Sequence, residues 1–247
     1  MRFVRQAVAV LFIIALPTAL VTTNVRIVAN EPRLYSYATD HYDTPQTTGI
    51  SRAELLRASK ELRAYFNSGS DAPVFIRVEQ DGQLVSLFSQ RETVHLKDVK
   101  NLFQTSFRVQ ELSVIFLLAY VVAVFIWARE ESLRSLAKQT LTAALCGALA
   151  IGAIGVAALA GFDATFERFH VIAFSNDLWQ LDPARDHLIQ MFPEDFWLDV
   201  SLAIGAVTLA ELALLAGAAL AYLRLSRDDD MAFVLEPAER DRGPAEA

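Results

Sequence analysis

This 247-residue chain lacks most of the features on which soluble binding and catalytic sites are built. Its one cysteine, Cys146, lies in an apolar run, which excludes a disulfide framework, a cysteine-based zinc site and a redox pair. The net charge is −7 and no basic cluster occurs, which excludes the electrostatics of a nucleic-acid reader. The chain also has no nucleophile-elbow serine, no phosphate-binding glycine loop and no His-x-x-x-His pair. Any chemistry must therefore use other residues, and we expect neither a metal nor a cofactor.

What the chain does have is apolar sequence, since 53% of its residues are hydrophobic. A helix that crosses about 30 Å of hydrocarbon needs about 20 mostly apolar residues. Four stretches meet that requirement, and polar sequence separates them: residues 1–28, 112–128, 141–161 and 198–223. The sequence therefore predicts an all-α membrane protein with four transmembrane helices. In the third of them Ala144, Ala148 and Gly152 recur every fourth position, which favours close packing of a neighbouring helix.

The first span allows a second interpretation. Arg2 and Arg5 before an apolar core are also typical of a signal peptide, but no small-residue cleavage site precedes Glu31, so we expect a retained span. Cations near the span ends set the orientation. They gather at both termini and in the segment 129–140, at Arg129, Arg134, Lys138, Arg224 and Arg227. This distribution predicts that both termini are cytoplasmic, including a disordered acidic tail at 224–247.

The predicted outer segments are residues 29–111 and 162–197. In the first, a capping box at Ser51–Glu54 begins a helix of about 15 residues that ends near Asn67. Asp81-Gly82 then favours a two-residue hairpin between short strands. Residues 31–50 are interpreted as loop or linker. We expect a small α+β extracytoplasmic cap that leans on the span ends or on the second outer segment.

The second outer segment is rich in aromatic residues, a composition typical of a belt at the membrane interface. They are Phe162, Phe166, Phe169, Phe174, Trp179, Phe192, Phe196 and Trp197. Simple anchoring of the chain is the plainer interpretation and accounts for about half of them. Glu211 lies inside the fourth span, where a carboxylate costs ~3 kcal/mol on insertion scales. It is either a structural hydrogen-bonding residue or a functional one.

Two histidines are the candidates for chemistry. His95 precedes the second span and His170 follows the third, so both fall on the outer membrane surface. Imidazole has an unperturbed pKa near neutrality, which suits a general acid–base pair. The alternative is that each histidine only hydrogen-bonds its own loop. His41 and His187 are predicted to be surface residues.

Polar residues beside the two histidines are candidates for binding headgroups or an oxyanion. Lys97, Asp98 and Lys100 follow the first histidine and, with a helix starting near Leu96, would face the headgroups in its first turn and a half. Snorkelling is their alternative role. The second group is Asn176, Asp177 and Trp179. Asn176 could donate to an oxyanion, and Asn176-Asp177 could equally form a turn or a helix cap.

At these motifs the sequence resembles the bacterial lipoprotein intramolecular transacylase (Lit) family of integral membrane proteins. The string from His95 to Lys100 is similar to the first histidine motif of that family. The second motif is matched by Glu167-x-x-His170, Phe174, Asn176-Asp177-x-Trp179, Leu181-Asp182-Pro183, Asp186 and Met191-Phe-Pro193-Glu194. Four spans with a large first outer segment complete the resemblance, which covers residues 1 to about 225.

The resemblance implies an O-to-N acyl shift within one substrate molecule. The sn-2 acyl chain of a diacylglyceryl-modified N-terminal cysteine moves to the α-amine, which gives a lyso-form lipoprotein without metal or external acyl donor. His95 and His170 match the two essential histidines of the family. The partners implied are a diacylated lipoprotein N-terminus and membrane lipid, at the outer face of the bacterial cytoplasmic membrane. Two alternatives remain: a non-catalytic lipid- or lipoprotein-binding or envelope assembly protein, and a transporter driven by Glu211, which the lack of an internal repeat disfavours.

Overall fold

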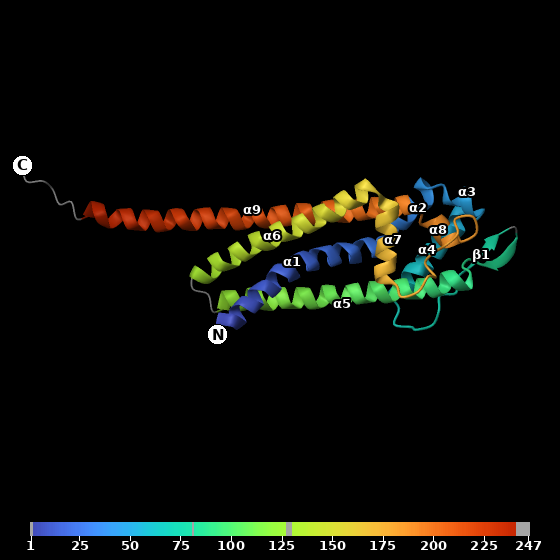
Figure 1. The fold of residues 1–247 in the computed structure, drawn as a ribbon, viewed down its shortest axis with the longest axis horizontal. Coiled ribbons are helices and arrows are strands. Elements are labelled where there is room, and N and C mark those ends of the chain that lie inside the picture. The colour runs from blue at the N-terminus through green and yellow to red at the C-terminus, as the bar shows by residue number, and fades with distance from the viewer. Residues whose placement is uncertain (1, 81, 127–129, 241–247) are drawn as a thin grey trace, which may run out of the picture. The chain divides into compact units, whose positions relative to one another are not determined.

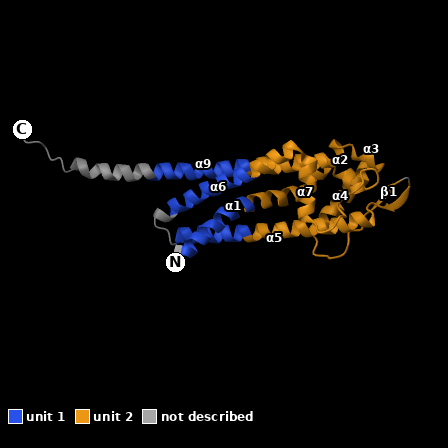
Figure 2. Ribbon diagram, viewed as in Figure 1, with its two compact units in different colours: residues 1–18, 113–150, 209–247 blue, residues 19–112, 151–208 orange. Residues whose placement is uncertain are grey.

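The structure is a computed structural model that describes residues 2–80, 82–126 and 130–240. The elements in chain order are α1 (Arg2–Asn30), α2 (Pro32–His41), α3 (Thr44–Thr48), α4 (Arg52–Asn67), β1 (Arg77–Gln80), β2 (Gln83–Ser86), α5 (Gln90–Ile126), α6 (Glu130–Ala160), α7 (Phe162–Ala173), α8 (His187–Met191) and α9 (Glu194–Arg240) (Figure 1). They form two compact units (Figure 2). Unit 1 holds residues 1–18, 113–150 and 209–247, and unit 2 holds residues 19–112 and 151–208.

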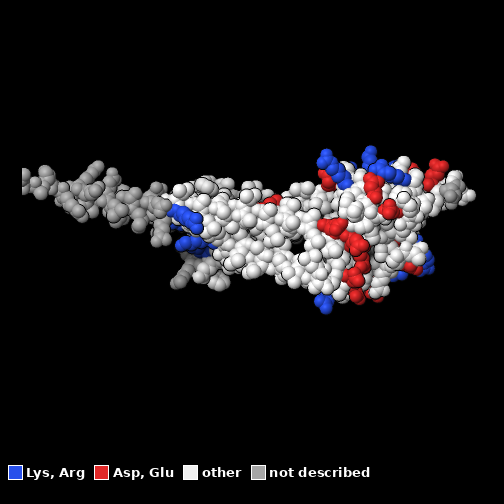
Figure 3. All heavy atoms as spheres, turned by 90° about the horizontal axis from the view of Figure 1, so that it is seen from above, with Lys and Arg blue, Asp and Glu red and all other residues white. Residues whose placement is uncertain are grey.

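Among the described residues, four helices are long and apolar enough to cross a membrane, namely α1, α5, α6 and α9. This confirms the predicted all-α membrane protein with four spans and a small two-stranded sheet. The face in view in Figure 3 carries most of its charged side chains on the cap, and the surface over the apolar helices is almost entirely white. The 37 residues of α5 extend over about 56 Å, far more than the hydrocarbon requires. All charged residues of α5 lie in its first part, up to Glu111, and the length of the helix does not require that part to lie in the hydrocarbon.

The predicted helix and hairpin of the cap are both present. Ser51 is the N-cap of α4, and its hydroxyl accepts from the Glu54 N–H. The Glu54 carboxylate contacts Arg57 and the Glu79 N–H, so it tethers α4 to β1. β1 and β2 pair antiparallel, with Gln80 opposite Gln83. Gly82 has a φ of 75°, a conformation that glycine adopts without steric cost, and Asp81 lies outside the described residues.

The interpretation of residues 31–50 as loop was wrong, because the segment forms α2 and α3. Glu31 caps α2 by accepting from the Arg33 N–H, and Pro32 occupies the first helical turn. Both signals are visible in the sequence, but a helix this short depends on tertiary burial. Tyr35, Ala38 and Ile50 supply that burial in the cap core.

The cap core joins α2, α4, the hairpin and the start of α5 to residues at the end of the second histidine motif and in the first turns of α9. Met191, Phe192, Phe196 and Val200 are buried in it, which agrees with the expectation that the cap leans on the second outer segment. Phe192 and Phe196 are 8% and 2% exposed. The prediction that these two rings lie at the membrane interface was therefore wrong, since they are core residues.

In unit 1, neighbouring helices come close to α6 at Gly147. A Cβ there would lie 2.7 Å from Pro17 Cβ and 3.1 Å from Leu212 Cδ1. The predicted packing face of Ala144, Ala148 and Gly152 was wrong at Gly152, because a Cβ there would meet nothing within 4 Å. The packing face therefore follows Ala144 and Gly147, which are both buried.

The fourth span also differs from the prediction at its end. α9 continues to Arg240, so the expectation of a disordered tail was wrong for its first part. Residues 241–247 lie outside the described part of the chain. Within α9, Glu211 is half-buried and takes part in an interaction within the protein.

Candidate active site

A capping box starts α5 six residues earlier than the predicted start at Leu96. The Ser89 hydroxyl accepts from the Glu92 N–H, and the Glu92 carboxylate accepts from the Ser89 N–H at 2.7 Å. The signal Ser-x-x-Glu is present at residues 89–92 and could have been found in the sequence. The prediction that the charged residues after His95 occupy a first helical turn was therefore wrong. They lie within a continuous helix.

The structure brings the two candidate histidines together. His95 lies in the second turn of α5, and His170 lies in the last turn of α7, which ends beside α5 (Figure 1). The centroids of their rings are 6.0 Å apart, and the ring planes make an angle of 37°. The two residues are 5% and 7% exposed. They form a pair of buried imidazoles within unit 2.

Aromatic rings surround His170, and one of them also contacts His95. The centroids of Phe166, Phe169, Phe174 and Trp179 lie 4.3, 5.3, 5.5 and 4.9 Å from that of His170. Phe174 also lies 5.0 Å from His95, edge to face. The prediction of a membrane-interface belt missed this arrangement. These rings exclude water from the imidazoles, and polar interactions are stronger in such a site than in water.

A hydrogen bond fixes the tautomer of His170. Its Nδ1 lies 2.7 Å from the Phe166 carbonyl oxygen. A carbonyl oxygen only accepts, so Nδ1 must carry the proton and donate it. In the neutral ring, Nε2 then holds the lone pair and can act as a base.

His95 differs in having a ring nitrogen without a partner. Its Nδ1 is buried and makes no hydrogen bond with the described residues. An unpaired buried polar atom is costly, and at a candidate site it indicates a place that a bound molecule can fill. His95 therefore offers an unoccupied hydrogen-bonding position beside the fixed ring of His170.

Burial keeps both imidazoles neutral. Both lie outside the apolar stretches, since the apolar part of α5 follows Glu111 and α7 is not one of the candidate spans. Desolvation lowers the pKa of His95 from 6.5 to about 4, nearby His170 lowers it further, and Asp98 opposes the shift. Desolvation also lowers the pKa of His170, against the hydrogen bond to the Phe166 carbonyl. A pair of neutral rings can accept and relay protons near neutral pH.

The candidates Asp98 and Asn176 contact each other across the site. The Asn176 amide donates to an Asp98 carboxylate oxygen at 2.9 Å, and its own oxygen accepts from the Leu178 N–H at 3.0 Å. The second bond forms the predicted turn. Asp177 contributes its backbone carbonyl, which accepts from Arg91 at 2.9 Å. Asp98 thus connects the first histidine motif to the second.

The prediction that Lys100 faces the headgroups was wrong. It is 3% exposed, and its ammonium group donates to the Ser68 hydroxyl at 2.8 Å and to the Ser70 carbonyl at 2.6 Å. The nitrogen also lies 4.3 Å from the centroid of the Tyr65 ring. These partners occupy the cation, so it stabilises the cap and does not face headgroups. Lys97 is half-buried and forms no ion pair with a described residue.

The other two histidines lie apart from this pair. His41 is exposed as predicted and stacks on Tyr37, with centroids 4.8 Å apart. His187 is half-buried, and its Nδ1 donates to the Leu87 carbonyl at 2.7 Å. The prediction of a plain surface residue was wrong for His187, because it ties α8 to the segment after β2.

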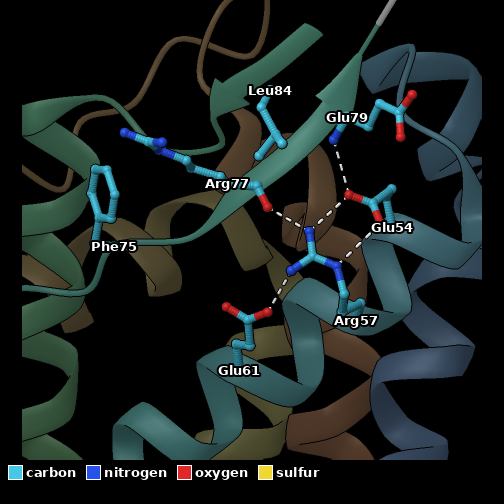
Figure 4. Close-up of a pocket in the computed structure, with 7 residues that line it drawn as sticks. All are labelled: Glu54, Arg57, Glu61, Phe75, Arg77, Glu79 and Leu84. Carbon is cyan, nitrogen blue, oxygen red and sulfur yellow. Dashed lines mark hydrogen bonds and ion pairs between the residues drawn. The ribbon is translucent and has the colours of Figure 1, made fainter. Parts of the chain in front are cut away.

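A surface groove of about 470 Å³ lies elsewhere in the cap, between α4 and the hairpin (Figure 4). Arg57 points into it and contacts Glu54, Glu61 and the Arg77 carbonyl. Arg57 holds the pKa of Glu54 at about 2. The charges satisfy one another, so the groove is a structural ion-pair network. In the described ranges, no group of three or more His, Cys, Asp or Glu residues is placed to hold a metal.

Comparisons with known proteins identify the family and the fold of the chain. The model of the family "lipoprotein intramolecular transacylase Lit" matches residues 10–197. A search of curated proteins found no match. Among solved structures, the chain is similar to the membrane integral lipoprotein intramolecular transacylase Lit from Bacillus cereus, with a TM-score of 0.69 and 20% identity over 94% of this chain and 100% of that one. Variants of that protein with one histidine replaced by arginine or alanine match at a TM-score of 0.69 and 19% identity, over 91% and 90% of this chain and 94% of theirs.

Proposed function

Because this chain belongs to the lipoprotein intramolecular transacylase family, and so is an acyltransferase of the membrane, we propose that it moves the sn-2 acyl chain of a diacylglyceryl-cysteine to the α-amine of that cysteine. The product is a lyso-form lipoprotein. The observation that carries the proposal is the buried pair His95 and His170. Their ring centroids are 6.0 Å apart, and aromatic rings surround His170. A shielded proton-transfer pair is what this reaction requires.

The environments of the two rings support a division of roles. The free α-amine attacks the carbonyl carbon of the sn-2 ester, and Nε2 of His170, the atom that holds the lone pair, takes the proton that the amine releases. His170 then passes this proton to one ring nitrogen of His95, while the other ring nitrogen of His95 donates a proton to the departing glycerol oxygen, so both rings end neutral. One C–N bond forms, one ester C–O bond breaks and one proton passes from nitrogen to oxygen.

Positioning contributes much of the rate. Amine and ester belong to one molecule, and holding them in near-attack geometry can supply up to ~7 to 11 kcal/mol of the barrier in ideal cases. The rings of Phe174 and Trp179 form a rigid boundary against which the substrate folds back on itself. The Asp98 carboxylate is placed to attract the substrate α-ammonium before it loses its proton, and Asn176 holds that carboxylate in place. Lys97 and Asp177 remain the candidates for headgroup contact.

The reaction is proposed to occur at the outer face of the bacterial cytoplasmic membrane. The distribution of Arg and Lys around the spans supports cytoplasmic termini and an extracytoplasmic cap. With this orientation the histidine pair lies at headgroup depth on the outer side, where a diacylated lipoprotein N-terminus is anchored by its acyl chains.

Mass spectrometry of a reporter lipoprotein tests the proposal. The reporter is expressed with this protein in a host that lacks N-acylating activity, and its lipidated N-terminal peptide is analysed. We expect the lyso-form peptide with the wild type and the diacyl peptide with His95→Ala or His170→Ala. A diacyl peptide with the wild type, in membranes that contain the folded protein, would favour a binding or assembly role and contradict the transacylase.

A further inference from the structure

The segment between α7 and α8, residues 174–186, carries three of the site residues but has little regular structure. We call it the site loop. It contributes Phe174, Asn176 and Trp179 to the surroundings of the histidines. A loop that places side chains this closely needs bonds to a rigid element. The contacts that supply them come from the first turn of α5.

Arg91 binds the middle of the site loop. Its guanidinium donates to the Asp177 carbonyl at 2.9 Å and to the Leu178 carbonyl at 3.4 Å. These two carbonyls lie between Asn176 and Trp179 in the chain. Arg91 therefore fixes the backbone that carries both site residues. The side chain is exposed, so it is not needed for the cap core.

Glu92 binds α8, just beyond the far end of the site loop. One carboxylate oxygen accepts from the Ser89 N–H and the other from the Leu188 N–H in α8, each at 2.7 Å. Glu92 is only 1% exposed, and a buried carboxylate is tolerated when hydrogen bonds satisfy both oxygens. The same side chain therefore caps α5 and anchors the start of α8.

The helix spacing connects these contacts to the histidine. Glu92, His95 and Asp98 are three residues apart in α5, so neighbouring side chains share one face of the helix. Along this face Glu92 holds α8, His95 contributes a ring to the pair and Asp98 binds Asn176. The loop is thus attached to α5 on both sides of the catalytic pair.

We propose that Arg91 and Glu92 are positioning residues that clamp the site loop to α5 and so hold Trp179 and Asn176 against the histidine pair. The inference rests on the proposed transacylase function. Neither residue touches the reacting atoms. Their contribution is the placement of the loop, and a misplacement of about 1 Å can cost up to ~100-fold in rate.

Glu92→Gln separates the two duties of this side chain. An amide has one acceptor oxygen for two N–H donors, so one of the two bonds must be lost. Glutamine at this position is compatible with a capping box, which leaves the bond to Leu188 as the one that breaks. Arg91→Ala removes the other half of the clamp from an exposed position, where folding does not depend on it.

The test uses the full-length protein in proteoliposomes with a synthetic diacylated lipopeptide. We expect kcat to fall about 10- to 100-fold in each variant, with KM changed less than threefold. Hydrogen–deuterium exchange should increase in residues 174–191 and stay unchanged in α4. Glu79→Gln and Arg77→Ala are matched controls, because both side chains are exposed in the same cap outside the site, and they should behave as wild type.

Wild-type kcat and wild-type exchange of the site loop in Arg91→Ala and Glu92→Gln would overturn the clamp. A loss of activity with a general rise in exchange across the cap would also overturn it, because the residues would then only stabilise the fold. His95→Ala, assayed in parallel, separates the two hypotheses. Retained activity in that variant contradicts the proposed function, whereas its loss together with unaffected clamp variants contradicts the clamp alone.

Discussion

The surroundings of His95 and of His170 differ more than their similar burial suggests. His95 belongs to a 37-residue helix, with the acidic residues Glu92 and Asp98 three positions to either side. His170 lies in the last turn of a 12-residue helix, and its neighbours are aromatic. Nδ1 of His170 is bonded within its own helix, whereas Nδ1 of His95 has no partner in the described structure.

This difference supports the different roles that we propose for two identical side chains. A bonded Nδ1 fixes the tautomer and leaves one nitrogen, Nε2, for proton transfer. An unbonded and buried Nδ1 leaves the ring free to change tautomer when a substrate supplies the partner. The fixed ring suits the base, and the free ring suits the relay. The predictions below test this comparison.

The largest effect is expected from removal of either ring. His170→Ala and His95→Ala should each lower kcat by about 10²- to 10⁴-fold, since each removes one step of proton transfer. The double variant should be little worse than the single ones, because the two rings act as a unit. The kcat of the single variants and of the double variant is measured from the rate of N-acyl product formation on a diacylated lipopeptide.

His41→Ala is the matched control for these variants. His41 is an exposed histidine of the same cap and stacks on Tyr37, outside the site. It should keep wild-type activity. If the kcat of the His95→Ala, His170→Ala double variant fell by the product of the two single losses, the two rings would not share one proton path.

Asp98→Asn should have the next largest effect. The substitution removes the negative charge proposed to attract the α-ammonium and keeps a group that can accept from Asn176, so we expect kcat/KM to fall about tenfold. It also removes the charge that opposes the lowering of the His95 pKa. The pKa of His95 should therefore fall further, and a rise would contradict this description of the site.

A substitution in unit 1 should affect stability without changing the chemistry. In Gly147→Leu the new side chain meets Pro17 and Leu212, and overpacking of this kind costs about 1–3 kcal/mol. We expect a lower Tm in detergent and an unchanged kcat per folded molecule. A large loss of kcat at full folding would mean that the packing of the spans determines the geometry of the histidines.

The smallest signal is the titration of the rings themselves. Burial lowers the pKa of both histidines, so both rings should still be neutral at pH 6.5, where a free imidazole is half protonated. His95 should protonate near pH 4. NMR of ¹⁵N-labelled histidine should report Nδ1–H for His170. The unfolded chain takes up protons first as the pH falls from 6.5 towards 4, so stability should decline over that range. Ordinary titration near 6.5 would contradict the burial of the pair.

Much of the fold could be predicted from the sequence because its signals are local. The four apolar stretches, the Ser51 cap and the Asp81-Gly82 turn each depend on residues close together in the chain. The two histidines could be singled out because few other side chains offer acid–base chemistry. Their proximity in space could be inferred only from their positions at the same predicted membrane surface.

The remaining features depend on contacts between distant residues. Lys100 resembles a snorkelling cation in the sequence, but Ser68 and Ser70 bury it. The aromatic residues of the second outer segment have the composition of an interface belt, yet Phe196 is core and Trp179 lines the site. Glu92 has a visible capping signal, but its bond to Leu188 spans 96 residues and could not be predicted.

The most direct test of the central claim is a crossover experiment with the purified protein. Two diacylated lipopeptides are mixed, one with a ¹³C-labelled sn-2 chain on a light peptide and the other with an unlabelled chain on a heavy peptide. A transfer within one substrate molecule predicts N-acylated products in which every labelled chain stays on the light peptide, formed by the wild type and absent with His170→Ala. Labelled chains on the heavy peptide would contradict the intramolecular mechanism.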